Sequence, residues 1–375
     1  MANQSRDRRE FLQESAAFSS AAVVAGMMGL PNLSANEAPI PEDEKLGVAL
    51  VGLGSLSTNQ IAPALQKTKR CKLAAIVSGT PAKREKWAKQ YDLAPEHIYT
   101  YETFDKIADD DSVDIIYIVL PNGMHCEYTV RAAKAGKHVF CEKPMAISSV
   151  ECRQMIDACQ KAERQLGIAY RCQFEPHHLK CIELAKSKQF GEIKEIVGGF
   201  GFKIGDPKQW RLNKKLAGGG PMMDVGIYAL QACRYLTGLE PELVTATETK
   251  TDPVKFKEVE ETLAWTMKMG DVNCSLTTTY AFNGINNFHA YCDNGNFGLN
   301  PAFNYSGIKG TSSKGPIELE QTDHFAAELD HFAQCVSDDG TELRLPGETG
   351  LQDLLIMEAI FKAAETGLAI KPESM

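Results

Sequence analysis

The stretch that decides the fold is LGVALVGLGSLS at residues 46–57, an uninterrupted apolar run that ends in Gly52 and Gly54. A continuous apolar run of this length predicts a strand that is buried on both faces. Gly52 permits a tight turn, and Gly54 lets the backbone approach a pyrophosphate at the N-terminus of the next helix. Ser57 replaces the third glycine of this fingerprint, where a small residue still fits. A plain strand–helix turn is the alternative interpretation.

Apolar runs continue to alternate with helical patterns as far as about residue 171. The further strands are predicted at residues 71–77, 113–120, 138–141 and 167–170. The helices between them are predicted at residues 60–67, 81–91, 127–135 and 150–164. Strands that alternate with helices predict a doubly wound parallel sheet, so residues 46–170 are interpreted as a Rossmann domain.

The second part of the chain, residues 171–375, has a different pattern. In residues 262–269 apolar and polar side chains alternate, which predicts an antiparallel strand with one buried face. Similar β character is predicted at 192–203, 242–249 and 273–282, and helices at 223–236, 323–336 and 350–365. We expect an α+β domain with a large open, mostly antiparallel sheet, and a last helix that packs back on the Rossmann domain. An open sheet face needs covering, so a homodimer or homotetramer is expected.

The first 38 residues form a separate segment. Arg8 and Arg9 precede Phe11 and Leu12, and an uncharged run of small and apolar residues follows at 16–30. A charged start, a short apolar run and a small-residue exit are typical of a signal peptide, and roughly 15 apolar residues are too few to span a bilayer. The pattern resembles a twin-arginine signal, which exports folded proteins. We therefore expect a periplasmic protein without membrane integration after signal removal, and a short N-terminal arm at 39–45.

Composition narrows the possible partners. The chain has 375 residues and a formal net charge of −9, which argues against a broad basic surface and against nucleic acid as a partner. Its 11 cysteines are scattered without a CxxC pair or the spacing of zinc ligands. We expect few or no disulfides and no metal site, which suits a chain that folds in the cytoplasm before export.

The end of the second strand bears on the choice of dinucleotide. NAD enzymes usually have Asp or Glu there to hold the ribose diol, whereas this chain has Ser78. Lys83 and Arg84 follow and can pair with a 2′-phosphate. The alternative is a solvated basic start of a helix. The residues favour NADP over NAD.

The third predicted strand ends at Leu120 and is followed by Pro121 and Asn122, at the edge where ligands of parallel sheets bind. These residues are predicted to shape the nicotinamide pocket. His125 comes next, and it either lines the same pocket or caps the following helix.

Glu142, Lys143 and Pro144 follow the next buried strand. A lysine at a strand end, in a cleft walled by a cofactor, loses solvation, so its pKa falls and it can hydrogen-bond a reacting hydroxyl. Lys143 is therefore the first catalytic candidate. A surface turn is the usual alternative for such a tripeptide.

A glycine triplet at 218–220 leads to Asp224 and Tyr228, which lie four residues apart and hence on one face of a helix. Together with Lys143 they predict a proton-transfer group at a substrate hydroxyl. The alternative is a capped helix whose tyrosine belongs to the core.

The motifs at 52–54, 142–144 and 218–228 together resemble the Gfo/Idh/MocA oxidoreductase family, over nearly all of the chain after about residue 40. By position, the resemblance implies that Tyr228 stands where many members have a catalytic histidine, with Asp224 in support. The implied substrate-binding residues are Lys143, Tyr170, Arg211, Asp224 and Tyr228. The implied cofactor-binding residues are Gly52, Leu53, Gly54, Ser55, Leu56, Ser78, Lys83, Tyr101, Leu120, Pro121, Asn122, His125, Glu142, Lys143, Arg171, Trp210 and Arg211.

The exported members that this chain resembles most imply a tightly bound NADP. They oxidise an aldose such as glucose to its lactone and pass the hydride to a second sugar, fructose or another aldose. The arm at 39–45 is shorter than the arm of those exported members. Its length therefore affects two expectations, that the cofactor is retained and that the chain forms a tetramer. Three alternatives stay open: an exported sugar dehydrogenase with exchangeable NAD(P), an NAD-dependent glycosidase of the same family, and a non-catalytic cofactor-binding sensor.

Overall fold

The computed structural model describes residues 40–338 and 340–375, which belong to one compact unit from Ile40 onwards. The expected signal peptide, residues 1–38, lies outside the described residues. The part of the arm that is described runs along the Rossmann domain, where the Ile40 amide donates a hydrogen bond to the Lys69 carbonyl over 3.2 Å. In the described part of the chain, no helix is both long and apolar enough to cross a bilayer.

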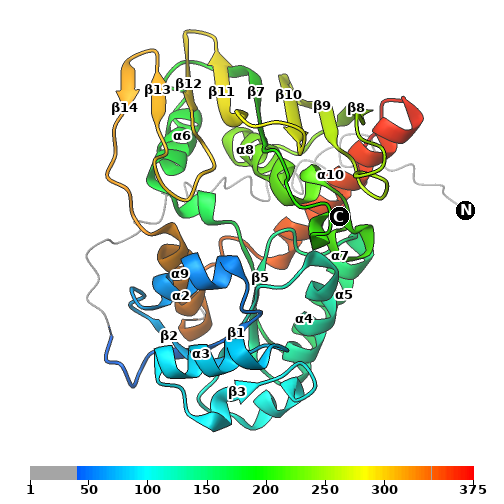
Figure 1. Cartoon of the computed structure of the whole chain (residues 1–375). Helices are drawn as coiled ribbons and strands as arrows, with labels where there is room; N and C mark the ends of the chain where they lie inside the picture. The colour runs from blue at the N-terminus through cyan, green and yellow to red at the C-terminus, as the bar shows by residue number, and fades with distance from the viewer. Residues whose placement is uncertain (1–39, 339) are drawn as a thin grey trace, which may run out of the picture. The chain divides into compact units, whose positions relative to one another are not determined.

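The N-terminal sheet has six parallel strands in the order β3-β2-β1-β4-β5-β6, as a doubly wound fold requires (Figure 1). The prediction of a parallel Rossmann sheet is confirmed. The sequence pattern missed only β3, because its two residues are too few to form an apolar run. The strands are β1 (Leu46–Val51), β2 (Cys71–Val77), β3 (Ile98–Tyr99), β4 (Ile115–Ile118), β5 (His138–Glu142) and β6 (Leu166–Ala169).

Helices connect these strands and cover the sheet. They are α2 (Ala62–Leu65), α3 (Pro81–Tyr91), α4 (His125–Lys134) and α5 (Ser149–Lys161), together with the 3₁₀ turns η2 (Pro95–His97), η3 (Phe104–Asp109) and η4 (Asn122–Met124). The first helix begins as a π-helical turn, η1 (Ser57–Ile61).

One helix on this sheet comes from the far end of the chain. α9 (His324–Ser337) lies beside α2 (Figure 1), and Phe332 stacks on Phe140 of β5 with ring centroids 4.8 Å apart. The Asp330 carboxylate accepts hydrogen bonds from the Lys69 and Arg70 amides over 2.8 and 2.9 Å. The Rossmann layer is therefore completed by a segment beyond residue 170.

The second sheet has eight strands in the order β14-β13-β12-β11-β7-β10-β9-β8, and every neighbouring pair is antiparallel except β7 and β10. The prediction of a mostly antiparallel open sheet is confirmed. Its strands are β7 (Ile193–Gly201), β8 (Leu243–Thr249), β9 (Thr262–Met269), β10 (Val272–Thr279), β11 (Asn286–Cys292), β12 (Gly295–Leu299), β13 (Gly310–Ser312) and β14 (Gly315–Ile317).

One face of this sheet packs on α6 (Pro176–Lys186) and α8 (Ile227–Thr237), as Figure 1 shows. Along β9 the alternate residues Leu263, Trp265 and Met267 are buried. The remaining short elements are η5 (Arg171–Phe174), η6 (Trp210–Leu212), α7 (Lys214–Ala217) and the π-helical η7 (Met222–Gly226).

The last helix, α10 (Gly347–Thr366), contacts both sheets, because it packs on β8 and also on β6 and α5. The Glu358 carboxylate accepts the Ser149 amide and hydroxyl over 2.7 and 2.8 Å. Gly350 permits the close approach, since a Cβ there would lie 2.8 Å from Met145. All 11 cysteines lie in the described part of the chain and all are free thiols.

Candidate active site

A cavity of about 450 Å³ opens at the carboxyl ends of the Rossmann strands, where residues of the second domain close its other side. All predicted site residues except His125 and Tyr170 line it. These are Gly52, Leu53, Gly54, Ser55, Leu56, Ser78, Lys83, Tyr101, Leu120, Pro121, Asn122, Glu142, Lys143, Arg171, Trp210, Arg211, Asp224 and Tyr228.

The glycine turn after β1 has the geometry that a pyrophosphate needs. Gly52 has a φ of 94°, and a Cβ there would lie 2.4 Å from the Val119 carbonyl oxygen, so only glycine fits. Apart from its chain neighbours, no atom of residues 40–338 or 340–375 lies within 4 Å of a Cβ built on Gly54, so this part of the chain leaves its backbone open. Ser57 ties the turn together, because its hydroxyl donates to the Gly52 carbonyl over 2.5 Å. The backbone geometry of this turn therefore fits a dinucleotide.

At the end of β2 the cavity wall contains Ser78, Thr80, Lys83 and Tyr101, and no carboxylate of the described residues lines this end. The guanidinium of Arg84 is not free, because its Nη1 donates a hydrogen bond to the Ser78 carbonyl over 2.6 Å. Lys83 is exposed at the rim. This end of the cavity fits a 2′-phosphate better than a bare ribose diol, because it offers a cation and no competing negative charge.

Lys143 lies at the centre of the site. Its Nζ donates to the backbone carbonyl of Asp224 over 2.6 Å and lies 4.5 Å from the ring centroid of Tyr228. Burial lowers the pKa of Lys143, although the nearby carboxylates of Asp224 and Glu142 oppose that shift. The lysine is thus held in place and loses its proton more readily than a solvated lysine.

Tyr228 lies between two cations. Lys143 approaches its ring as described, and Cζ of Arg171 lies 4.9 Å from the same ring centroid. Arg171 is fixed by the carbonyls of Phe303 and Asn304, which accept its Nη2 and Nη1 over 2.6 and 3.1 Å. Burial raises the pKa of Tyr228, and the positive charge of Arg171 opposes the rise. The phenol is therefore a weak acid whose anion the site stabilises as it forms.

The carboxylate of Asp224 accepts hydrogen bonds from residues other than Tyr228. Its Oδ2 accepts Arg211 Nε over 2.9 Å and the Tyr280 hydroxyl over 2.8 Å. Arg211 in turn stacks on Trp210, with Cζ 4.6 Å from the ring centroid. Asp224 thus positions Arg211 through its side chain and Lys143 through its backbone carbonyl.

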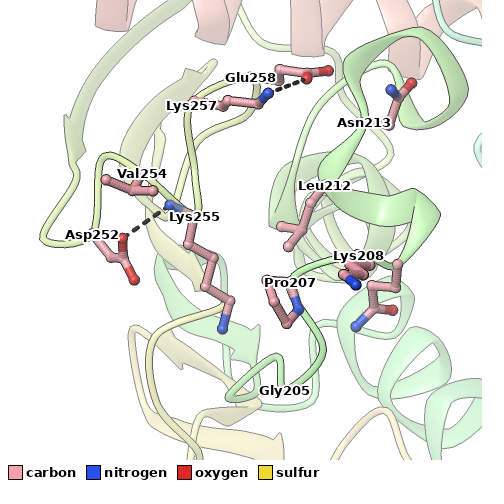
Figure 2. A pocket seen from close by; sticks show the side chains of 11 residues that line it. Gly205, Pro207, Lys208, Leu212, Asn213, Asp252, Val254, Lys255, Lys257 and Glu258 are labelled. Atoms are coloured by element: carbon pink, nitrogen blue, oxygen red, sulfur yellow. Dashed lines mark hydrogen bonds and ion pairs between the residues drawn. The ribbon is translucent and has the colours of Figure 1, made fainter.

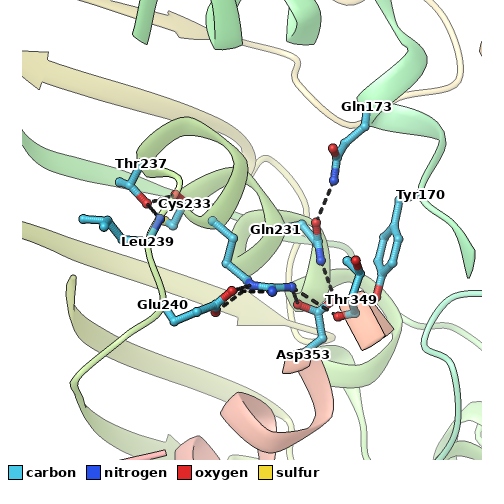
Figure 3. Close-up of polar contacts among 10 residues, drawn as sticks. Tyr170, Gln173, Gln231, Cys233, Thr237, Leu239, Glu240, Thr349 and Asp353 are labelled. Carbon is cyan, nitrogen blue, oxygen red and sulfur yellow. Dashed lines mark hydrogen bonds and ion pairs between the residues drawn. The ribbon is translucent and has the colours of Figure 1, made fainter. Parts of the chain in front are cut away.

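Tyr170 and His125 lie outside the cavity, which corrects their assignment to the substrate and cofactor sites. The Tyr170 hydroxyl donates to Asp353, which also accepts Gln231 and Arg234 over 2.5 and 2.7 Å (Figure 3). Tyr170 is therefore part of a buried network between β6, α8 and α10.

His125 is fully buried at the start of α4. Its Nδ1 and Nε2 lie 2.9 Å from the carbonyl oxygens of Pro144 and Leu120 respectively. The imidazole joins the loops that carry Asn122 and Lys143, so it supports the cavity wall from behind.

Two aromatic residues that the sequence pattern did not indicate also line the cavity. Tyr305, which is 51% exposed, stacks on Arg171 with Cζ 4.7 Å from its ring centroid, and Phe325 of α9 lies 5.5 Å from Tyr305. Tyr305 follows β12 in an irregular loop without a motif, so only the folded chain reveals that it belongs to the site.

A second cavity of about 530 Å³ lies between the loops at 205–213 and 252–258 (Figure 2). It is more open to solvent, and lysines such as Lys208 and Lys255 line it together with Asp252 and Glu258. None of the predicted site residues lines this cavity, so we assign the active site to the cavity at the Rossmann strand ends.

Family models match both halves of the chain. Residues 46–170 match the oxidoreductase family with an NAD-binding Rossmann fold, and residues 178–298 match the GFO/IDH/MocA C-terminal domain. A D-xylose 1-dehydrogenase [NADP(+)] from Haloarcula marismortui is 30% identical over 342 residues, which cover 88% of this chain and 94% of the relative. The chain belongs to the Gfo/Idh/MocA oxidoreductase family and is an oxidoreductase, as predicted.

Solved structures agree with this assignment. An aldose–aldose oxidoreductase from Caulobacter crescentus, crystallised with glycerol, is 42% identical with a TM-score of 0.85, and the match covers 87% of this chain and 99% of that one. A putative NADPH-dependent oxidoreductase from Desulfitobacterium hafniense, 21% identical, shares the fold with a TM-score of 0.77 over 88% of this chain and 98% of its own.

Proposed function

We propose that the protein is an NADP-dependent sugar oxidoreductase that oxidises an aldose, such as glucose, to its lactone. The observation that carries the proposal is the arrangement of Lys143 and Tyr228 in one cavity with the Gly52–Leu56 turn. A relative that is named as an NADP(+)-dependent D-xylose 1-dehydrogenase and one that is titled an aldose–aldose oxidoreductase support the substrate class. The absence of a carboxylate beside Ser78 and the presence of Lys83 support NADP.

The residues that line the cavity would hold the dinucleotide, and a nicotinamide bound there would supply the hydride chemistry, while the protein supplies positioning and proton transfer. Tyr228 and Lys143 together accept the proton of the anomeric hydroxyl: the phenol takes it as it passes its own proton to uncharged Lys143, and Arg171 stabilises the negative charge that develops on the oxygens. Arg211, positioned by Asp224, is available to a second sugar hydroxyl. In the reverse step the same phenol protonates the alkoxide that forms.

We further propose that a second sugar, fructose or another aldose, receives the hydride while NADP(H) stays bound, as in a glucose–fructose or aldose–aldose oxidoreductase. A cavity lined by residues of both domains supports retention, and the two domains are joined beside it where Asn122 of the Rossmann domain donates to the Ala217 carbonyl over 2.8 Å. A dehydrogenase with exchangeable NADP is the second candidate, supported by the match to the D-xylose enzyme.

The test is the near-ultraviolet absorbance of reduced nicotinamide in protein purified without added nucleotide. Absorbance that appears with glucose and disappears with fructose or another aldose supports the closed cycle. A protein that needs added NADP supports the dehydrogenase. A bound cofactor that no sugar reduces would contradict both and would favour the glycosidase or the sensor.

Location and assembly remain part of the proposal. The twin-arginine pattern at residues 8–12 supports export to the periplasm, and it is tested by fractionation of cells that produce the chain with Arg8 and Arg9 replaced by lysine. A homodimer or homotetramer is supported by the open sheet, whose exposed positions include Thr245 and Thr266 on the face opposite the buried residues of β9. Light scattering gives the oligomer size.

A further inference from the structure

One buried carboxyl group, that of Glu328, has no part in the chemistry described above, although it lies on α9, the helix that also carries the cavity residue Phe325. Glu328 of α9 is 1% exposed, and neither of its carboxylate oxygens has a hydrogen-bond partner among the described residues. Nε of Arg171 and Nδ1 of His324 are also buried there without partners in the described part of the chain. An ionised carboxylate in such a place has neither solvation nor hydrogen bonds, so it tends to take up a proton.

The surroundings of Glu328 determine how firmly that proton is held. Burial raises the pKa of Glu328 well above its ordinary value, the negative charges of Glu142 and Asp323 add to the rise, and Arg171 opposes it. His324 on the same helix is kept neutral, since burial lowers its pKa to about 3. Glu328 is therefore a carboxyl group whose protonation depends on the balance of a few nearby charges.

Glu142 is the second buried carboxyl group of the cluster. It is 7% exposed, and the Tyr117 hydroxyl donates to its Oε1 over 2.8 Å. Burial raises its pKa and the positive charge of Lys143 opposes the rise. Two like charges that interact in a buried site do not titrate independently, so Glu142 and Glu328 tend to share one proton.

This pair adjoins both groups that handle the substrate proton. Glu142 precedes Lys143 in the chain and lines the cavity, while the Arg171 guanidinium lies over the ring of Tyr228. Nη1 of Arg171 also lies 3.4 Å from Nε2 of His324, which is four residues before Glu328 on α9. A change of charge inside the cavity therefore acts on the pair directly. NADP⁺ brings a positive nicotinamide ring, whereas NADPH brings a neutral one.

We propose that Glu142 and Glu328 form a proton store that takes up the hydroxyl proton of the sugar in one half-reaction and returns it in the other. On oxidation the sugar C–H bond breaks, its hydride goes to the nicotinamide, and the O–H proton passes by way of Tyr228 and Lys143 to the carboxylate pair. The nicotinamide loses one positive charge and the pair loses one negative charge, so the buried site keeps its total charge. The return step reverses both transfers, and this inference rests on the proposed NADP-dependent function.

The inference is tested first by the protons that accompany nucleotide binding. Nucleotide-free protein is titrated with NADP⁺ and with NADPH by calorimetry in two buffers of different ionisation enthalpy at neutral pH. We expect NADP⁺ to release about one proton more than NADPH, because only the positive ring drives the shared proton out. The 2′-phosphate is common to both nucleotides, so its own titration cancels in the difference.

Glu328→Gln is expected to abolish this difference, because a single carboxylate beside Lys143 and Arg171 stays ionised with either nucleotide. Glu261→Gln is the matched control, since Glu261 is equally buried but accepts hydrogen bonds from Thr251 and Asp252 away from the cavity. It should keep the difference. Equal proton release by the two nucleotides in the unsubstituted protein would overturn the inference, as would a full difference in Glu328→Gln.

A second measurement separates this inference from the proposed function. An aldose is mixed with the NADP⁺-loaded protein in weak buffer, and a pH indicator is followed with the nicotinamide absorbance before the lactone opens. We expect little proton release for each hydride transferred, and about one proton in Glu328→Gln. Hydride transfer with one proton released by the unsubstituted protein contradicts the store alone. No hydride transfer with any sugar contradicts the proposed function, while the calorimetric result still decides the store.

Discussion

Tyr228 and Lys143 carry the most direct prediction about single residues. Tyr228→Phe keeps a ring between Lys143 and Arg171 but removes the acidic hydroxyl, and Lys143→Met removes the amino group while keeping a long side chain. Each variant should lose about 10²- to 10⁴-fold in the rate of hydride transfer, as expected for loss of a general acid–base group. NADP binding should stay within a few-fold, which fluorescence titration measures.

Tyr291→Phe is a suitable control, because Tyr291 lies exposed on β11 away from the cavity. It should transfer hydride at the unsubstituted rate. Full activity in Tyr228→Phe would show that another group accepts the proton.

The lowered pKa of Lys143 predicts a pH dependence. Oxidation of the sugar needs a proton acceptor, and a lysine accepts a proton only in its uncharged form. Because burial lowers this pKa from its ordinary 10.5, the rate of oxidation should rise with pH and level off below the range in which a free lysine titrates. Lys143→Arg stays charged throughout and should lose the rising limb. Stopped-flow rates across the pH range check both statements.

Tyr170→Phe tests the correction of the predicted substrate site. The substitution removes the hydrogen bond to the buried Asp353 and should cost about 1–3 kcal/mol of unfolding free energy, as measured in urea. The KM for sugar should not change, because Tyr170 lies outside the cavity. A raised KM without a loss of stability would restore the residue to the substrate site.

The sequence was informative about site residues that stand at fixed places in a strand–turn–helix unit. Gly52, Ser78 and Lys143 each follow a buried strand, so their position at the sheet edge follows from the fold class alone. Tyr305 contacts Arg171 from a loop of the second domain, and Tyr280 contacts Asp224 from the residue that follows β10, and no local spacing links them to Asp224 or Arg171. Such contacts depend on the packing of distant segments.

At the scale of elements, the turn between β2 and α3 predicts the choice of nucleotide. Lys83→Ala removes the exposed cation at this end of the cavity and should weaken NADP binding about tenfold or more, with little effect on NAD. Lys89→Ala, on the same helix but outside the cavity lining, should leave both affinities unchanged. Equal weakening by the two substitutions would mean that the helix attracts the nucleotide only through its overall charge.

The secondary structure was predictable where an element is long and periodic. The 3.6-residue and two-residue patterns indicated α9, α10 and β7–β10, whereas the strands β11–β14 were missed. Three of these strands, β12 to β14, are short and contain glycine, and β13 and β14 have three residues each. The sequence pattern also could not predict the parallel pairing of β7 with β10. Alternation of apolar and polar residues specifies a buried face but not the direction of the neighbouring strand.

At the scale of the whole molecule, buried neutral histidines predict loss of stability in acid. Burial lowers the pKa of His178 and of His324 to about 3, while in the unfolded chain each titrates near 6.5. Below 6.5 the unfolded state therefore binds more protons than the folded state, so stability falls with falling pH down to about 3. Each histidine contributes up to about 1.4 kcal/mol per pH unit.

Urea unfolding between pH 7 and pH 4 checks this slope. His178→Gln should make the decline shallower by about 1.4 kcal/mol per pH unit, and His289→Gln, on β11 and partly exposed, should leave it unchanged. A stability that does not change over this range would contradict the assignment.

The position of α9 on the Rossmann sheet has a consequence for the newly made chain. All six strands of that sheet are synthesised before residue 170, yet the helix that supplies Phe332 against β5 and Asp330 against the turn before β2 begins only at residue 324. When the strands of the nucleotide-binding segment have all been synthesised, the helix α9 that covers their apolar surface has not yet been made. Completion of the N-terminal half therefore waits until α9 has been synthesised, and a chain that is cut short before α9 leaves this surface open to aggregation.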